Sequence, residues 1–434
     1  MAGASVMTGG RTAVPVLIAS ALAYVSLLPY PYIAGPVFHT IPVLRLVPLG
    51  IGLVLAVYLL AWKILDHNKE HALPLAAPLL GLFLVQTLGS IQSVDPGASL
   101  GKTAFYFVTG PVFFLAASVI DRRAARALLL AVAVLGLVSG LVSVIEVLTG
   151  SVPLFGHAYE ANNPYVHYEG LVGRSFGLAG HPVFLGGFFV LALAAAFYAV
   201  RTAEGPVLKL FAFVGLAAGL VGLFLTFSRG AWAAVAVSAI VFYGRRLHVA
   251  RAIAAAAVLV ALIVGLSASS GRVWEVLKSR DPVSEYVGNA DTAHRLRAFG
   301  LTARIMGDVP LLGAGTGNYR TLYNRYRDRA DDSRQTYATP DNMYLAALAE
   351  TGMAGLALLV FILMALYRLL SGDGLSEDAL ALAGSAAVAG FCVDIFFFDA
   401  FYVESLRVLF WSMAGCCVGQ VCAAGGRSGQ CQAL

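Results

Sequence analysis

Charged residues are scarce in this sequence. Only 12% of its 434 residues are Asp, Glu, Lys or Arg, and 59% are hydrophobic, whereas soluble domains carry about 25% charged residues. Apolar runs of about 17–25 residues, the length that crosses the hydrocarbon core of a bilayer, recur along the chain. The pattern of short alternating strands that marks a membrane barrel is missing, so an all-α polytopic membrane protein is favoured.

Signals for three kinds of site are also missing. The cysteines lie only in the last two expected helices and the tail, which argues against disulfides and against a cysteine zinc site. Gly313–Gly317 follows no strand and opens no βαβ unit, so we expect a turn there and not a nucleotide-binding loop. The histidines are scattered, and no paired acidic motif for Mg²⁺ or Mn²⁺ is present. We therefore predict chemistry by side chains alone, without a metal or other cofactor, and no nucleic-acid partner.

Hydropathy predicts twelve membrane spans, with eleven as the alternative count. The first is expected to be a retained helix and not a removed signal peptide. The expected spans are 13–33, 42–64, 73–92, 103–120, 126–148, 183–200, 209–227, 230–244, 251–268, 343–368, 379–400 and 403–424.

The distribution of Lys and Arg predicts the orientation of these spans. With the N-terminus in the cytoplasm, 13 of the 29 cations lie on the inner side and 5 in short outer segments, as the positive-inside rule requires. We therefore expect a protein of the cytoplasmic (inner) membrane with both termini in the cytoplasm. Residues 1–268 form spans one to nine with an outer loop at 149–182, residues 269–342 a large outer (periplasmic) loop, residues 343–424 the last three spans, and residues 425–434 a cytoplasmic tail.

The large outer loop carries two helical signals. In the first, from Asp291 to Met306, the expected apolar face consists of Leu296, Phe299, Ala303 and Met306. In the second, tyrosines recur at helical spacing among arginines, at Tyr319, Tyr323 and Tyr326. This second pattern suits a helix lying at the headgroup surface, or else a merely solvated or lipid-facing amphipathic helix.

The loop ends in Pro340-Asp341-Asn342, which runs directly into an apolar helix. Asp341 occupies the position of an N-cap residue, whose side chain accepts hydrogen bonds from the first helix N–H groups. One interpretation is that Asp341 is only a cap. The other is that it places an ionisable carboxylate at the mouth of a membrane bundle.

Two arginines lie near expected helix ends on the same side as Asp341. Arg174 precedes the sixth span, and Arg229 lies in the short connection between the seventh and eighth spans. A guanidinium matches phosphate oxygens bidentately, so the pair could hold a diphosphate. Alternatively, each arginine snorkels or pairs with a carboxylate of the bundle, such as Glu146, Glu350, Asp399 or Glu404. His181 could be a ligand, a proton carrier or a hydrogen-bonded interface residue.

Four motifs occur together in this order: Arg174 before the sixth span, Thr226–Trp232, Asp308–Tyr319 and Asn342–Gly352. With the span count and the long outer loop, they resemble the O-antigen ligase and polymerase superfamily. The resemblance implies a GT-C-type bundle and a metal-independent, inverting glycosyltransferase. Its donor would be an oligosaccharide on undecaprenyl diphosphate, used on the outer face of the cytoplasmic membrane.

The same resemblance implies roles for individual residues. Arg174 and Arg229 match the diphosphate-binding arginines, and Asp341 matches the general base, where ligases have a histidine. Supporting roles fall to His181, Arg295, Asn342 and Tyr344.

The aspartate favours the polymerase branch, which joins lipid-linked repeat units into O-antigen, capsule or exopolysaccharide, with a chain-length regulator or flippase as partner. The alternatives are a ligase that transfers the glycan to lipid A core or to a protein, and a polysaccharide transporter or flippase.

Overall fold

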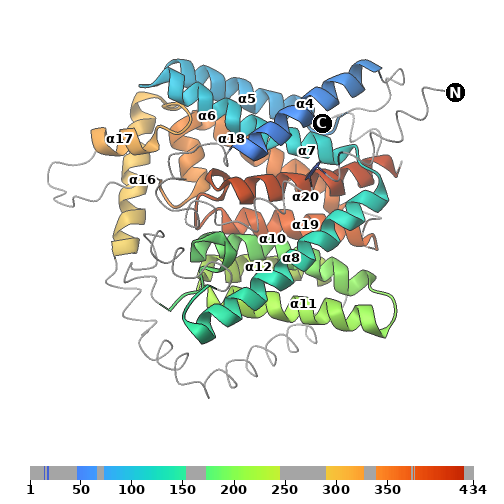
Figure 1. Cartoon of the computed structure of the whole chain (residues 1–434). Helices are drawn as coiled ribbons and strands as arrows, with labels where there is room; N and C mark the ends of the chain where they lie inside the picture. Colours follow the sequence, from blue (N-terminus) through green and yellow to red (C-terminus); the bar gives the residue numbers. More distant parts are fainter. Residues whose placement is uncertain are drawn as a thin grey trace.

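The computed structural model describes residues 14, 17–18, 46–65, 73–152, 173–244, 290–326, 339–372, 375 and 377–424. Its helices are α4 (Leu46–Leu65), α5 (Ala76–Ile91), α6 (Pro96–Thr109), α7 (Pro111–Ser118), α8 (Arg122–Thr149), η3 (Gly177–Ala179), α10 (Pro182–Thr202), α11 (Pro206–Leu225), α12 (Arg229–Tyr243), α16 (Ala290–Asp308), α17 (Tyr319–Tyr326), α18 (Met343–Ser371), α19 (Ala379–Asp394), η4 (Ala400–Tyr402) and α20 (Glu404–Ala423) (Figure 1). The predicted spans 13–33 and 251–268, most of the loop 149–182 and the tail fall outside the described residues.

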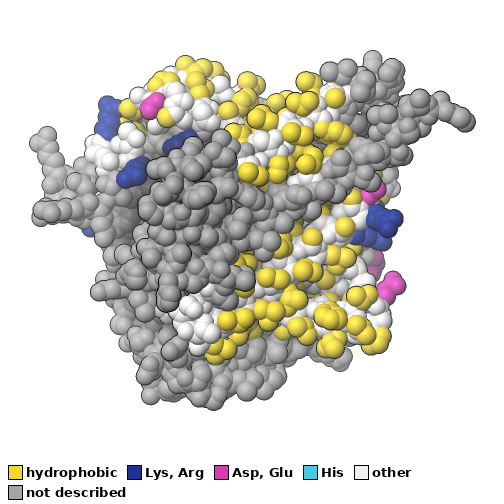
Figure 2. All heavy atoms as spheres, viewed as in Figure 1, with side chains coloured by type: hydrophobic (Ala, Val, Ile, Leu, Met, Phe, Trp, Pro, Cys, Tyr) yellow, Lys and Arg dark blue, Asp and Glu magenta, His cyan; other side chains and the backbone are white. Residues whose placement is uncertain are grey.

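These helices confirm a helical, polytopic membrane protein. Among the described residues, six helices are long and apolar enough to cross a membrane, and four shorter apolar helices accompany them. The figure of twelve spans is therefore not reached within the described ranges. Hydrophobic side chains cover the middle of the face in Figure 2, and charged side chains gather toward its edges. Side chains such as Val57, Leu210 and Phe211 are more than half exposed on α4 and α11, as expected of surfaces that contact lipid.

Two predicted spans differ from the structure at their boundaries. The span 103–120 is divided into α6 and α7 at Gly110-Pro111, because proline lacks the N–H that would continue the helix. The spans 379–400 and 403–424 were expected to almost touch, but α19 ends at Asp394 and α20 begins at Glu404. The segment between them, which we call the 395–403 loop, is apolar enough to read as helix in sequence yet forms turns and the short helix η4.

Helix α18 is interrupted at Gly352, whose φ of 65° lies in the left-handed region that favours glycine. The predicted turn at 313–317 is confirmed, and it packs into this interruption. The N–H groups of Ala314 and Gly315 donate to the carbonyls of Ala349 and Glu350, at 3.0 and 2.9 Å. In return, the N–H groups of Met353 and Ala354 donate to the carbonyls of Pro310 and Leu311. Irregular backbone at membrane depth is tolerated where protein satisfies its polar groups in this way.

Helix α16 crosses one end of the bundle, with α17 beside it (Figure 1). Both predicted helices of the outer loop are confirmed, but the predicted apolar face of α16 is wrong. Phe299 is 50% exposed, whereas Leu301 and Ile305 are buried because they pack with α17. Tyr319 and Tyr323 belong to the same small cluster and are buried. These two tyrosines therefore form a core of the outer segment and do not lie on a lipid-facing surface.

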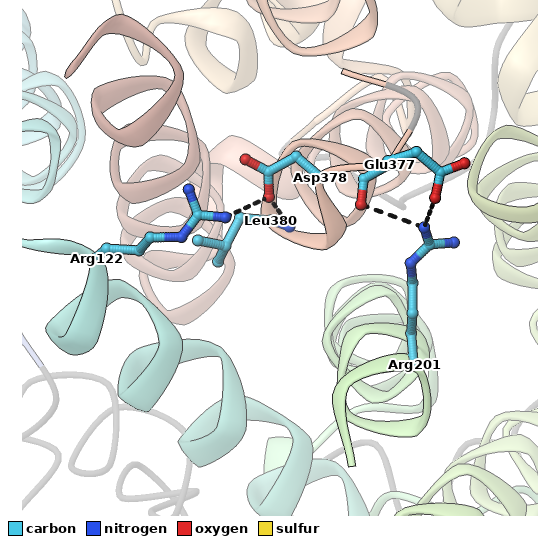
Figure 3. Close-up of polar contacts among 5 residues, drawn as sticks. All are labelled: Arg122, Arg201, Glu377, Asp378 and Leu380. Atoms are coloured by element: carbon cyan, nitrogen blue, oxygen red, sulfur yellow. Dashed lines mark hydrogen bonds and ion pairs between the residues drawn. The ribbon is translucent and has the colours of Figure 1, made fainter. Parts of the chain in front are cut away.

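The ends of the bundle differ in sequence and in contacts. The Asp341 end carries the first residues of α10, α12, α18 and α20 and the last residues of α8, α11 and α19. The Arg122 end carries the opposite termini of these helices. There, Arg122 pairs with Asp378 at 2.9 Å and Arg201 with Glu377 at 3.2 Å (Figure 3). These ion pairs connect α8 and α10 to the segment that leads into α19.

Candidate functional site

Helix α18 begins with Asn342 as its N-cap. The Asn342 side-chain oxygen accepts hydrogen bonds from the N–H groups of Tyr344 and Leu345, at 2.9 and 3.1 Å. The prediction that Asp341 caps this helix is therefore wrong by one residue. Asp341 has a φ of 50°, a left-handed conformation that aspartate tolerates better than most residues. The cap of α18 is therefore provided by Asn342, and Asp341 lies in the turn that precedes it.

The backbone of Asp341 is held by Asp399 of the 395–403 loop. One carboxylate oxygen of Asp399 accepts the N–H of Asp341 at 3.1 Å, and the other accepts the N–H of Asn342 at 2.9 Å. Asp399 is only 5% exposed. Burial, followed by the charge of Asp341, raises the pKa of the Asp399 carboxyl to about 7. A second carboxylate thus fixes the turn that presents Asp341.

Tyr344 and Met343 tie the same helix start to α19. The Met343 N–H donates to the carbonyl of Ile395 at 2.8 Å, and the Tyr344 hydroxyl donates to the carbonyl of Cys392 at 2.9 Å. Asn342 and Tyr344, two of the predicted supporting residues, therefore have structural contacts. Asn342 caps α18, and Tyr344 bonds the start of α18 to the end of α19. Both contacts fix the direction in which α18 leaves the Asp341 turn.

Arg174 lies in a turn that Glu146, near the end of α8, holds in place. The Glu146 carboxylate accepts the Ser175 hydroxyl at 2.6 Å and the N–H groups of Phe176 and Gly177 at 3.0 and 2.8 Å. Charge-assisted bonds of this kind are about twice as strong as neutral ones. These contacts show that Glu146, one of the carboxylates predicted as a possible ion-pair partner, organises the backbone next to Arg174.

The Arg174 turn is bonded to the corner between α11 and α12. The Arg174 Nε donates to the carbonyl of Thr226 at 2.7 Å, and the Ser175 N–H donates to the carbonyl of Leu225 at 2.9 Å. Three residues beyond Thr226, Arg229 opens α12 and is exposed. The structure therefore brings the two predicted arginines to one corner of the Asp341 end, although they are 55 positions apart in sequence.

His181 is the N-cap of α10 and lies beside this corner. Its Nδ1 accepts the N–H of Val183 at 3.3 Å, and its ring is 4.6 Å from that of Phe184. Burial, followed by the charge of Arg174, lowers the pKa of His181 to about 3. His181 is therefore neutral at physiological pH and caps a helix, which disfavours its prediction as a proton carrier.

The 395–403 loop connects the arginine corner to Asp341. Phe397 packs directly on Gly230, where a Cβ atom would come within 2.6 Å of it. The next ring, Phe398, stacks on Phe184 at 6.2 Å between centroids. The residue after that, Asp399, holds the Asp341 turn. Three consecutive residues of one loop thus link the backbone of the candidate base to the helices that begin at the arginine corner.

Glu350, two residues before the interruption of α18, fixes the outer segment to the bundle. Its Oε1 accepts the N–H of Tyr319, the first residue of α17, at 3.1 Å. Arg295 lies in the first half of α16, which packs against α17 and α18. Helices α16 and α17 therefore pack against the part of α18 that contains Glu350 and the interruption.

Sequence reasoning missed Asp399, Glu146, Glu350 and Tyr319 as parts of the site. The three carboxylates carried a signal, since isolated charges at membrane depth normally mark a site or a pair. They had been considered only as partners for arginine. Within the described ranges, no three His, Cys, Asp or Glu side chains come together as a metal-ligand set.

Comparison with known families agrees with the motifs. Residues 211–360 match the O-Antigen ligase family. This match confirms the resemblance and covers Arg229, Asp341 and the first part of α18 with its interruption at Gly352, while Arg174 and Asp399 lie outside the matched segment. No curated protein matches the chain. The family supports a function of the O-antigen ligase or polymerase type, a glycosyltransferase-like activity, and gives no support to the transporter alternative.

Proposed function

We propose that the protein is an inverting glycosyltransferase that polymerises oligosaccharide repeat units carried on undecaprenyl diphosphate. The observation that carries this proposal is the position of Asp341. Asp399 holds its turn, and the same loop packs against the corner that bears Arg174 and Arg229. A base and two cations at one end of a membrane bundle are the groups that glycosyl transfer from a lipid diphosphate requires.

The reaction follows from this arrangement. An acceptor hydroxyl oxygen attacks the anomeric carbon of the donor sugar, and a new C–O bond forms on the face opposite the leaving group. The bond between that carbon and the diphosphate oxygen breaks, and its electron pair stays on the diphosphate. Arg174 and Arg229 neutralise the charge that develops there. Asp341 takes the proton of the attacking hydroxyl, a role worth about 10²–10⁴ in rate.

The reaction is proposed to use side chains alone and to occur on the outer face of the cytoplasmic membrane. The excess of Lys and Arg in the segments expected on the inner side supports this orientation for the Asp341 end. The growing chain would leave the site on its lipid carrier, and a chain-length regulator or a flippase would be its partner. Tyr319 and α17 would cover the site from the aqueous side.

A ligase is the second candidate, because the family match supports both activities and does not separate them. In that case the same three residues would transfer a finished glycan to lipid A core or to a protein. We prefer polymerisation because Asp341 replaces the histidine expected of ligases.

Reconstitution of the purified chain in lipid nanodiscs with EDTA tests the proposal. The substrate is the lipid-linked repeat unit that accumulates in source cells lacking this protein, and the products are separated by size. Wild type is compared with Asp341→Asn, because asparagine tolerates the left-handed φ and keeps the side-chain shape.

A ladder of lipid-linked products from the wild type alone is the expected result. An unchanged repeat unit that moves to lipid A core or to a peptide, once either is added, would assign the ligase function. Equal ladders from both proteins would remove Asp341 from the mechanism, and a ladder abolished by EDTA would contradict chemistry by side chains alone.

A further inference from the structure

A cavity of about 70 Å³ lies between α5, α6, α18 and the start of α20. Its lining includes apolar side chains such as Leu79 of α5 and Leu359 of α18. The polar residues that line it are Gln86, Tyr106, Thr316, Glu350, Tyr402 and Arg407. Such a cavity has room for several water molecules, since one needs about 10–15 Å³. Neither the proposed base nor the arginine corner accounts for these polar groups.

Of the polar residues that line this cavity, Thr316, Glu350 and Arg407 are buried and the other three are half-buried. Thr316 is 2% exposed and Tyr319 is 1% exposed. Two buried hydroxyls in or near the cavity, those of Thr316 and Tyr319, lack hydrogen-bond partners among the residues that the structure describes. A buried hydroxyl left in that state costs about 1–3 kcal/mol, so it calls for a ligand or water that completes it.

The Tyr319 and Tyr402 hydroxyls lie among carboxylates. Burial, followed by the charges of Asp399, Tyr323, Asp341 and Glu350, raises the pKa of Tyr319. Burial, followed by the charges of Glu350, Tyr106 and Asp399, likewise raises the pKa of Tyr402. Both hydroxyls therefore stay protonated. They remain hydrogen-bond donors beside acceptors, which is the mixed lining that a polyhydroxylated ligand requires.

Arg407 is fixed rigidly in the cavity wall. Its Nε donates to the Thr109 hydroxyl at 2.9 Å, and a second guanidinium nitrogen donates to the carbonyl of Phe401. The guanidinium carbon lies 4.6 Å from the centre of the Tyr106 ring. That ring stacks on Tyr402 at 5.9 Å. A cation, a carboxylate and stacked aromatic rings are thus preorganised around one small cavity.

Residues of the 395–403 loop contact both the cavity and the arginine corner. Phe397 and Phe398 face that corner through Gly230 and Phe184, whereas Tyr402 lines the cavity. Between them, Asp399 holds Asp341. Inverting transfer needs the attacking hydroxyl and the departing diphosphate on opposite faces of the anomeric carbon. The geometry therefore provides a polar cavity where an acceptor would approach.

We propose that this cavity is the subsite for the acceptor saccharide, in which Thr316, Tyr402, Glu350 and Arg407 bind sugar hydroxyls. This inference rests on the proposed glycosyl transfer. It adds a binding place for the second substrate, the acceptor. Lipid-linked donor and acceptor would then meet at the Asp341 turn, each held against different residues of the 395–403 loop.

The test separates the two substrates kinetically. The donor is the lipid-linked repeat unit, and the acceptor probe is the free repeat-unit oligosaccharide released from it by mild acid, which can accept but cannot donate. Rates of transfer to the labelled oligosaccharide give KM for each substrate in wild type, Thr316→Val and Tyr402→Phe. Tyr367→Phe, on an exposed face of α18, is the matched control, and thermal unfolding of each variant checks its fold.

The expected result is that each hydroxyl deletion raises KM for the oligosaccharide about three- to tenfold, the loss typical of one neutral hydrogen bond. KM for the lipid-linked donor should stay within about twofold, and Tyr367→Phe should change neither value.

Unchanged acceptor KM values, or a rise in donor KM instead, would overturn the subsite while leaving the transfer reaction intact. A wild type that makes polymer but neither uses the oligosaccharide nor is inhibited by it would also overturn the subsite. A wild type without any transfer would remove the proposed function itself.

Discussion

At the Arg122 end of the bundle, charged side chains pair with one another at the surface, whereas at the Asp341 end buried carboxylates bond to the backbone. The pairs Arg122–Asp378 and Arg201–Glu377 are partly exposed (Figure 3), and such pairs contribute about 0–1 kcal/mol. The buried Glu146, by contrast, accepts N–H groups from the Arg174 turn. The first kind of contact joins helices, and the second shapes a turn.

This difference shows how a chain with few charges uses them. A buried carboxylate is costly to desolvate, so it persists where several donors converge on it. Asp399 receives two N–H groups from the Asp341 turn, and Glu350 receives one from α17. Each of these carboxylates lies next to a candidate functional residue. At the Asp341 end, the buried carboxylates therefore position backbone turns. We expect substitutions of charged residues at this end to change activity and stability more than substitutions at the Arg122 end.

The largest difference is expected between two arginines. Arg229→Ala should lower the rate of transfer about 10²–10³-fold, the loss typical of one group that stabilises a developing oxyanion. Arg201→Ala, at the other end, should leave the rate within about twofold, since its pair with Glu377 is a surface contact. Initial rates of both variants in nanodiscs measure this contrast. Similar losses in both would mean that the ends are not functionally distinct.

The pH dependence of the transfer rate should show the titration of the Asp399 carboxyl. Because its pKa is raised to about 7, the Asp399 carboxyl is protonated below that pH and ionised above it. The ionised form adds a negative charge beside Asp341 and strengthens it as a base, so activity should rise as the pH increases through about 7. The rise should be at most about tenfold, as expected for one pKa unit.

In Asp399→Asn the group no longer titrates, and the rise near pH 7 should disappear. A profile of the wild-type shape but lower amplitude would show that Asp399 only holds the backbone.

We expect a smaller difference between the two ends when a carboxylate is neutralised and the free energy of unfolding is measured. Glu146→Gln should lower the free energy of unfolding by about 1–3 kcal/mol, because it weakens charge-assisted bonds inside the protein. Glu377→Gln should cost less than about 1 kcal/mol. Unfolding of each variant in detergent, with the same detergent for both, measures the difference. Equal losses would contradict a special role for the buried carboxylate.

Much of the fold was predictable because it depends on local pattern. Hydropathy located α8, α10, α11 and α18 to within a few residues, and tyrosine spacing located α17. The Asp341 and arginine motifs were likewise readable in the sequence.

The loop that joins these motifs was not predictable. Phe396, Phe397 and Phe398 extend an apolar run past the end of α19, so hydropathy cannot show where that helix stops. The bond between Asp399 and Asp341 crosses 58 positions, and neither residue's neighbours reveal it. The prediction of which face of α16 is buried was also wrong. Packing against α17 buries Leu301 and Ile305 and not the expected apolar face.

The central claim is that Asp341 takes a proton from the acceptor, and replacing it with two residues of different basicity tests this most directly. Histidine and asparagine both tolerate the left-handed φ of this position, but only histidine can act as a base near neutral pH. Single-turnover rates in nanodiscs are measured for wild type, Asp341→His and Asp341→Asn across pH 5–9.

The account predicts that Asp341→Asn loses about 10²–10⁴-fold. Asp341→His should keep a measurable rate, with an acid limb at the pH where the new imidazole titrates. Equal rates for the two variants, without a new acid limb, would contradict the assignment of Asp341 as the base.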